Sequence, residues 1–190
     1  DFDGTLAETE RDGHRVAFNL AFEEFGLDWF WDEHRYGELL RVTGGRERLL
    51  LDMRSRADAP DEPRREALAV ALHACKNTHY AQLVDSGAVQ LRPGVLDLMT
   101  DCAAAGVRLA IATTTSRSNV EALLATALGD PWRTRFAAVL CAEDAPLKKP
   151  DPQVYHRCLA ALDLPASAVL AVEDSPAGVA ACVAADVPVI

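Results

Sequence analysis

Long apolar runs and positive charge are both scarce in this sequence. No stretch of apolar residues reaches the roughly 18 that a membrane-spanning helix needs. Only 19 lysines and arginines stand against 29 acidic residues, so the formal net charge is −10. A chain with this charge is repelled by phosphate backbones and by anionic lipid surfaces. We therefore expect neither a nucleic-acid partner nor a membrane partner.

Cysteine is also sparse, and its spacing excludes the common thiol motifs. The chain has five cysteines, and no two of them form a CxxC pair. Most lie in apolar surroundings, which is typical of small core residues in a reducing compartment. We therefore expect no structural metal site on the cysteines, and a cytoplasmic protein.

The second half of the chain has the pattern of an α/β domain. Its 190 residues, 49% of them hydrophobic, suffice for one medium domain or two small ones with a sizeable core. Apolar runs with the length and density of buried parallel strands lie at 107–113, 136–142, 168–173 and 187–190. Helical patterns lie around them at 94–105, 117–128, 151–162 and 176–185. This alternation predicts an α/β fold, a doubly wound parallel sheet with helices on both faces.

The region between residues 11 and 89 shows no such strands. Helical patterns fill it at 14–26, 32–41, 45–57 and 61–87. Gly26 is suited to end the first of these helices, and Pro63 to the first turn of the last. We therefore expect an all-helical block, residues 11–89, inserted into a discontinuous α/β core of residues 1–10 and 90–190.

Polar side chains follow the predicted strands at the edge where open α/β sheets bind ligands. They are Asp1-Phe2-Asp3, Thr113-Thr114-Thr115-Ser116, Lys148-Lys149-Pro150 and Glu173-Asp174-Ser175. Mg²⁺ prefers carboxylates, waters and phosphate oxygens. A carboxylate near that ion and a lysine can attack phosphorus, because the cations neutralise the repulsion between two anions. Each segment alone is more often a solvated turn, a loop or a helix cap, but coincidence at four strand ends favours a phosphate and metal site.

These segments match four motifs of a known superfamily in their order along the chain. "DFDGT", the threonine after "LAIA", "KKPDP" and "VEDSPAG" together span nearly the whole sequence. The chain resembles the haloacid dehalogenase superfamily of aspartate-nucleophile phosphotransferases. The resemblance implies that Asp1 is the nucleophile, which forms an aspartyl-phosphate. It implies that Asp3 protonates the leaving oxygen and later activates water, with its backbone carbonyl on Mg²⁺.

The spacing of Asp1 and Asp3 agrees with these two roles, because residues two apart in an extended segment share a face. Gly4 would let the chain turn away, and the Thr5 hydroxyl would brace the loop.

The resemblance assigns the other three motifs as well. Thr113 would hydrogen-bond the phosphoryl group, helped by the backbone N–H of Thr114. Lys149 would pair with the phosphate and with Asp1. Asp174, with Glu173, would complete the Mg²⁺ shell.

The helical block resembles the mobile cap of the beta-phosphoglucomutase-like branch of this superfamily. Such caps close over the site, exclude water and supply substrate contacts. Lys76 and Asn77 with Tyr80 resemble a Lys-Asn-x-x-Tyr element of caps that grip sugar phosphates. The alternative is that these residues form a plain amphipathic helix face.

Other charged residues are candidates for substrate contacts. In "RVTGGRER" either Arg46 or Arg48 can meet a distal phosphate, and we favour Arg46. Arg117 can contact the same phosphate from the core. Glu8 is a candidate ligand for sugar hydroxyls, whereas His14 is expected to be a packing or capping residue.

The segments "AETERDGHRVAFNLAFEEFGLDW" and "VTGGRER" are similar to the CbbY group. That group comprises sugar-bisphosphate phosphatases associated with carbon fixation, similar to enzymes that dephosphorylate xylulose 1,5-bisphosphate. The resemblance implies a Mg²⁺-dependent phosphatase acting on a phosphorylated sugar, and we expect a monomer. A phosphosugar mutase would share every catalytic residue. A non-catalytic phosphoacceptor domain fits less well, because such domains lack the second aspartate and the helical cap.

The position of the nucleophile also bears on the ends of the sequence. In a doubly wound sheet of this kind the nucleophile ends the first, central strand, yet Asp1 is the first residue here. We expect the natural protein to extend both ways, with an apolar run of about five residues before Asp1.

Overall fold

The computed structural model describes residues 1–190 and divides into two compact units. The core unit comprises residues 1–9 and 89–190, and the cap unit comprises residues 10–88. Each unit is described by itself below.

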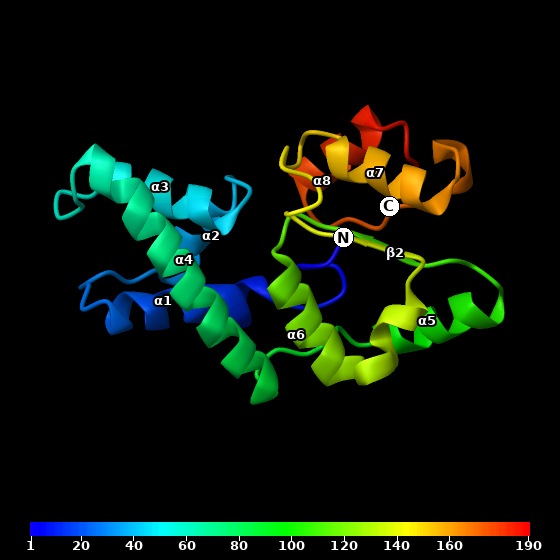
Figure 1. Ribbon diagram of the computed structural model, residues 1–190, viewed down its shortest axis with the longest axis horizontal. Coiled ribbons are helices and arrows are strands. Elements are labelled where there is room, and N and C mark those ends of the chain that lie inside the picture. Colours follow the sequence, from blue (N-terminus) through cyan, green and yellow to red (C-terminus); the bar gives the residue numbers. More distant parts are fainter. The chain divides into compact units, whose positions relative to one another are not determined.

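The core unit is built from strands with helices on both sides. Its elements are α5 (Val95–Ala104), β1 (Ala110–Ala112), α6 (Arg117–Leu128), β2 (Ala138–Leu140), α7 (Gln153–Leu162) and α8 (Pro176–Ala184), with 3-10 turns at Asp130–Arg135 and Ala166–Ala168. β1 and β2 pair in parallel, with Ala110 opposite Ala138. Figure 1 shows α7 and α8 on one side of the strands and α5 and α6 on the other. This arrangement confirms the predicted α/β fold class.

The strands are shorter than the sequence predicts, although they form at the expected places. The runs at 107–113 and 136–142 each contribute three paired residues. The runs at 168–173 and 187–190 meet in a single parallel bridge between Ala171 and Val189. Apolar density reports burial, whereas a strand also needs a hydrogen-bonded neighbour at each successive residue, so the predicted lengths were too long.

Helices α7 and α8 form the interior of the core unit together with the strands. Val154, Tyr155, Cys158 and Leu162 of α7 are buried at positions that share one helical face. Ala181 and Cys182 of α8 belong to the same cluster. The apolar spacing that predicted these helices is therefore also the spacing that packs them.

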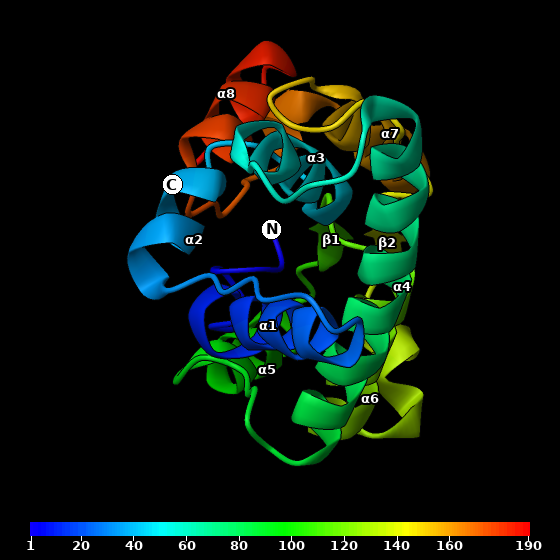
Figure 2. The same cartoon turned by 90° about the vertical axis from the view of Figure 1, so that its left-hand side faces the viewer.

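The cap unit is entirely helical, as the sequence predicts. A π-helical turn (Glu10–His14) leads into α1 (Arg15–Glu24), followed by α2 (Glu33–Leu39), α3 (Gly45–Ser55) and α4 (Glu62–Asp85). The side chain of Asp32 caps α2 by accepting from the backbone N–H of Arg35. Gly26 follows α1 with a φ of +65°, which suits a residue without a β-carbon. Helices α1 and α4 pack against each other, and Figure 2 shows them crossing.

The interior of the cap unit is rich in aromatic side chains. Phe18, Phe22, Trp29, Trp31 and Tyr36 are buried together, with ring centroids of Phe22 and Trp31 5.0 Å apart. None of the helices in either unit combines the length and apolar character that crossing a membrane requires.

Candidate active site

The first motif is anchored by its phenylalanine. The Phe2 side chain is fully buried, so the flanking carboxylates of Asp1 and Asp3 turn away from the interior. The Leu6 N–H donates to the Phe2 carbonyl at 2.9 Å and closes a tight turn. Three residues after this turn, the Thr9 hydroxyl donates to Asp3 Oδ1 at 2.6 Å. The Asp3 carboxylate is therefore held by its own loop.

Arg92 fastens this loop to the returning chain. Its guanidinium donates to the Gly4 carbonyl at 2.7 Å and to Glu8 Oε2 at 3.0 Å, and its backbone N–H donates to the Leu6 carbonyl at 2.9 Å. Glu8, predicted to bind sugar hydroxyls, is exposed and paired with Arg92 in this structure.

Lys149 is the centre of the polar network in the core unit. Its buried ammonium donates to Asp1 Oδ1 at 2.9 Å, to Glu173 Oε1 at 2.5 Å and to the Ala112 carbonyl at 2.9 Å. These three contacts use all three ammonium hydrogens. Burial lowers the pKa of Lys149, while the adjacent Glu173 favours the charged form. The result is a fixed ammonium between the carboxylates of the first and fourth motifs.

Three carboxylates from the first and fourth motifs converge at this point. Ligand oxygens of Asp1, Glu173 and Asp174 all lie within 4.8 Å of one another. Glu173 Oε2 is buried and has no hydrogen-bond partner in the structure. Burial raises the pKa of Asp174, although the Thr5 hydroxyl, 3.1 Å from its Oδ1, acts in the opposite direction. Hard carboxylate oxygens, one of them unsatisfied, fit Mg²⁺ well.

Two motif glycines make room for these carboxylates. A β-carbon built on Gly4 would lie 2.1 Å from Asp174 Oδ2, and one built on Gly178 would lie 1.8 Å from Glu173 Oε2. Gly4 also has a φ of +76°, which suits the turn that the sequence predicted. The room that Gly4 leaves for Asp174 was not evident from the sequence. Thr5, expected to brace the loop, holds Asp174 instead.

Tyr155 is a residue of the network that sequence reasoning missed. Its hydroxyl donates to Glu173 Oε1, and the Lys149 ammonium lies 5.1 Å from the centroid of its ring. Burial raises the pKa of Tyr155, as does the neighbouring Glu173, so the phenol keeps its proton. The only signal in the sequence was its place on the apolar face of α7, which is the pattern of a core residue.

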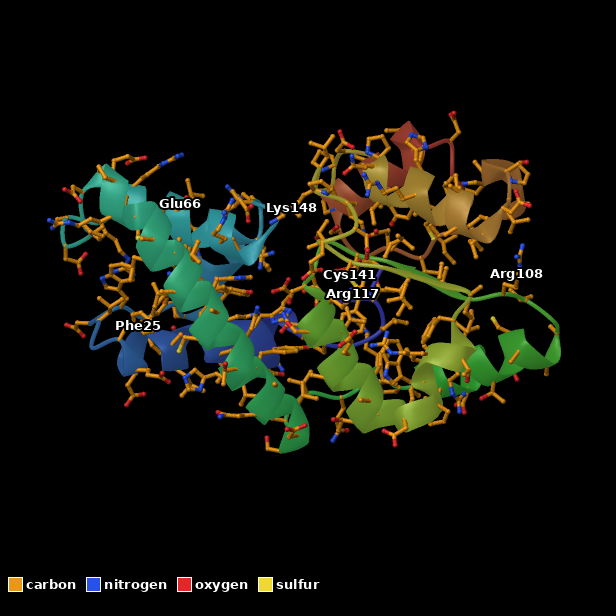
Figure 3. All side chains as sticks on the ribbon, in the orientation of Figure 1. Phe25, Glu66, Arg108, Arg117, Cys141 and Lys148 are labelled. Atoms are coloured by element: carbon orange, nitrogen blue, oxygen red, sulfur yellow. The ribbon has the colours of Figure 1, made fainter.

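The second motif sits where β1 runs into α6. The Thr113 N–H donates to the Leu140 carbonyl at 3.0 Å, and its buried hydroxyl accepts from the Thr115 N–H at 3.2 Å. Thr114 follows in the bend and is half-buried. Arg117 opens α6, and its guanidinium lies 2.5 Å from Asp144 Oδ2. The ion pair with Asp144 gives this candidate phosphate ligand an acidic partner within the core unit; Figure 3 labels Arg117.

In the cap unit, Lys76 is buried rather than displayed on a helix face. Its ammonium lies 2.9 Å from His14 Nδ1 and 5.0 Å from the centroid of the Tyr80 ring. The side chain of the next residue, Asn77, is 3.5 Å from the same ammonium. His14 packs on Tyr80 with ring centroids 4.3 Å apart, in keeping with the expected packing role.

The two arginines of the glycine-rich segment lie in different environments. Arg46, favoured from the sequence, is half-exposed and pairs with Glu66 at 2.9 Å; Figure 3 labels Glu66 on α4. Arg48 is buried and donates to the Tyr36 hydroxyl at 3.0 Å, with Glu10 Oε2 at 3.4 Å. Of these two arginines, Arg48 is therefore the one that faces the interior of the cap unit.

Comparison with known proteins places this constellation in a family. The model of the haloacid dehalogenase-like hydrolases matches residues 1–186. The chain therefore belongs to this family of hydrolases. It is an enzyme, and its relatives support a phosphatase.

Within the family, the chain is similar to the CbbY group. It is 47% identical to protein CbbY of Cupriavidus necator over 194 residues, which cover 100% of this chain and 75% of the relative. The crystal structure of CbbY from Rhodobacter sphaeroides in complex with phosphate matches with a TM-score of 0.91 and 41% identity, over 100% of this chain and 82% of that one. A variant of the same protein in complex with xylulose-(1,5)bisphosphate matches with a TM-score of 0.91 and 40% identity over the same shares of the two chains.

Proposed function

We propose that the chain is a Mg²⁺-dependent phosphatase that hydrolyses a sugar bisphosphate such as xylulose 1,5-bisphosphate. The observation that carries this proposal is the buried Lys149 ammonium bridging Asp1 and Glu173 next to a group of three carboxylates. The xylulose-(1,5)bisphosphate complex of the CbbY relative supports the choice of substrate. The carbon-fixation setting, the cytoplasmic location and the monomeric state belong to the same proposal.

The reaction follows from the groups that the chain provides. Asp1 attacks phosphorus, so that a bond from its carboxylate oxygen to phosphorus forms as the bond to the sugar oxygen breaks. Asp3 gives its proton to the departing sugar oxygen. It then takes a proton from the water that attacks the aspartyl-phosphate, which releases phosphate and restores the Asp1 carboxylate.

The remaining core residues hold the reacting groups in place. Lys149 orients Asp1 and offsets the charge of the approaching phosphate. The Thr113 hydroxyl and the Thr114 N–H bind phosphoryl oxygens. When bound, Mg²⁺ would be held by Asp1, Asp174 and Glu173 with the Asp3 carbonyl, and would supply positive charge that neutralises the transferred phosphoryl group.

The second phosphate and the sugar hydroxyls need further ligands. Lys76, Asn77 and Arg46 of the cap, together with Glu8 and Arg117, are the candidates for this role. In the structure Glu8 and Arg117 already have partners of opposite charge, so substrate binding would exchange those ion pairs for contacts to the sugar phosphate.

Phosphate release tests this proposal. The protein is incubated with xylulose 1,5-bisphosphate and Mg²⁺, and free phosphate is measured with and without chelator. Asp1→Asn should abolish turnover, because the amide has the same shape but cannot attack phosphorus. Asp3→Asn should slow turnover by the roughly 10²–10⁴-fold typical of general acid–base catalysis. Full activity in chelator, or turnover by pure Asp1→Asn, contradicts the proposal.

The mutase alternative is separated in a parallel reaction. Beta-glucose 1-phosphate is supplied with catalytic glucose 1,6-bisphosphate, and glucose 6-phosphate and free phosphate are followed together. Isomerisation without phosphate release would replace the phosphatase assignment with the mutase.

A further inference from the structure

Three donor groups of different chemistry meet on the cap unit, and none of them takes part in the proposed reaction. They are the Glu24 carboxylate, the Cys75 thiol and the His79 imidazole. One ligand atom from each lies within 4.8 Å of the other two, and Glu24 Oε2 is 2.8 Å from His79 Nε2. The hydrogen bond between Glu24 and His79 shows that these side chains already point at one another.

Helical geometry positions the three donors. Cys75 and His79 are four residues apart on α4, so they project from the same face of that helix. Glu24 is the last residue of α1, which packs along α4. The carbonyl end of a helix carries partial negative charge and favours a cation. The donors therefore stand on two packed helices rather than on loops, at an end of α1 suited to positive charge.

The donor set indicates the class of cation. Zinc-class ions bind their ligands in tetrahedral geometry. The bond lengths are about 2.3 Å to sulfur, about 2.0–2.1 Å to imidazole nitrogen and about 2.0–2.2 Å to carboxylate oxygen. Donors at those lengths stand roughly 3.3–3.8 Å from one another in a tetrahedron, within the 4.8 Å that already contains these three. Glu24 is exposed, so its side chain can adjust to admit an ion. Mg²⁺ prefers oxygen ligands and does not compete well for this set.

We propose that Glu24, Cys75 and His79 bind a zinc-class divalent cation that joins the end of α1 to α4, with a water as fourth ligand. The expectation that the cysteines hold no metal rested on the lack of CxxC spacing. The spacing of cysteines along the chain carries no information about ligands that two different helices bring together.

A reactive thiol is the competing reading of Cys75, and the surroundings disfavour it. Burial and the neighbouring Glu24 carboxylate both raise the pKa of the Cys75 thiol. Reactive cysteines lie in positively charged surroundings that lower the pKa. A bound cation would remove the cost of placing a thiolate beside this carboxylate.

Cobalt is the probe that tests the site, because a thiolate ligand has its own optical signature. Co²⁺ is titrated into the whole protein in excess Mg²⁺, which occupies the carboxylate site of the core. We expect thiolate-to-cobalt charge-transfer absorption and tetrahedral visible bands that saturate at one ion per chain. Zn²⁺ should displace them. Absence of the charge-transfer band from the unaltered protein overturns the proposal.

Matched variants identify the ligands. Cys75→Ser should remove the charge-transfer band, whereas Cys102→Ser, which changes a partly buried cysteine of the core unit, should retain it. His79→Gln and Glu24→Gln should weaken binding by more than the roughly 10- to 100-fold that loss of an outer-shell partner costs. A band that survives Cys75→Ser or disappears in Cys102→Ser contradicts the assignment.

Thermal unfolding gives a second readout that does not depend on activity. A ligand that binds only the folded state raises the unfolding temperature by mass action. Zn²⁺ should therefore raise the unfolding temperature of the cap in the unaltered protein and leave that of Cys75→Ser unchanged, both measured in excess Mg²⁺. An equal response of the two proteins would show that Zn²⁺ acts elsewhere. The circular dichroism of each metal-free variant establishes beforehand that it is folded.

Discussion

At the scale of single residues, the site depends on the space around its carboxylates as much as on the carboxylates themselves. The Glu173 side chain is fully enclosed and shares Lys149 with Asp1. Its second oxygen occupies the position that a β-carbon of residue 178 would take. A glycine is therefore as necessary here as the acid, although it has no functional group to offer.

The first prediction concerns Gly178→Ala. The added methyl group would lie 1.8 Å from Glu173 Oε2, so Glu173 must move and its contact with Lys149 must weaken. Loss of a charge-assisted hydrogen bond is worth about 1.5–3 kcal/mol, and we expect kcat/KM to fall by roughly 10- to 150-fold with a higher Mg²⁺ requirement. Steady-state kinetics over a range of Mg²⁺ concentrations measures both effects.

Gly37→Ala is the matched control for this substitution. Gly37 lies inside α2, and a β-carbon there would meet no atom within 4 Å. Alanine is favoured over glycine in helices by up to about 1 kcal/mol. The control should therefore keep full activity and gain slight stability. A fully active Gly178→Ala protein would refute the steric argument.

At the scale of elements, helices α2 and α3 of the cap are joined by one buried carboxylate. Asp52 of α3 accepts hydrogen bonds from the Trp31 indole at 2.9 Å, from Arg56 at 2.7 Å and from Arg35 of α2 at 2.5 Å. Its side chain is 4% exposed, whereas those of Arg35 and Arg56 are 37% and 21% exposed. This one residue links two helices and the segment between α1 and α2.

The second prediction concerns Asp52→Asn. The amide keeps the size of the side chain but leaves two arginines without their buried counter-charge. Breaking a buried ion pair costs roughly 3–5 kcal/mol, and solvent at the two arginines should place this case at or below the lower end of that range. Urea unfolding can be followed by tryptophan fluorescence, to which Trp29 and Trp31 of the cap and Trp132 of the core unit contribute. Asp61→Asn, which removes an exposed partner of Arg64, should cost at most about 1 kcal/mol.

The same carboxylate predicts an acid-sensitive contribution to stability. Burial alone would raise the pKa of Asp52, but hydrogen bonds from Arg56, Trp31 and Arg35 hold it below its usual value. The stabilisation is therefore present above the unfolded pKa of about 3.9 and is lost as pH falls through the folded pKa. The difference in unfolding free energy between the unaltered protein and Asp52→Asn should narrow below about pH 4. If the difference in unfolding free energy between the two proteins stayed constant across that pH range, Asp52 would not contribute to the loss of stability in acid.

At the scale of the whole molecule, the proposed function draws on residues from both units of the chain. The proposed catalytic groups all belong to the core unit, whereas the cap unit carries the candidate substrate residues Lys76, Asn77 and Arg46. Under the proposed function, a small phosphate ester needs only the core unit, while a sugar bisphosphate also needs ligands for its second phosphate.

The third prediction separates these contributions through Lys76→Met, and it depends on the proposed function. Methionine removes the ammonium that lies over the Phe18 and Tyr80 rings, but its flexible thioether can pack against the same rings. We expect kcat/KM for xylulose 1,5-bisphosphate to fall by about 10- to 150-fold, the worth of a charge-assisted contact. The effect on nitrophenyl phosphate should be much smaller.

Arg64→Met is the control, because the Arg64 side chain is 81% exposed at the start of α4. It should alter neither substrate's kinetics. Equal losses with both substrates in Lys76→Met would remove this lysine from substrate recognition and leave the core assignment unaffected.

Much of the fold and of the site could be predicted from the sequence, because those features are recorded in local spacing. Apolar residues at helical intervals located all four cap helices and the four helices of the core, since a helix buries the face that its own sequence defines. The order of the four motifs singled out Asp1, Thr113, Lys149 and Asp174, and of these Thr113 directly follows strand β1. Burial of Phe2 between two aspartates follows from the alternation of an extended segment.

The tertiary structure alone decided which distant groups share a contact. Lys149 and Tyr155 both hold Glu173, and Gly178 leaves room for the same carboxylate. Arg48 rather than Arg46 faces the cap interior, and Glu24 meets Cys75 and His79. Local spacing determines which face a side chain occupies, but the packing of one element on another determines what that face meets. No interval within a single helix or strand encodes that second choice.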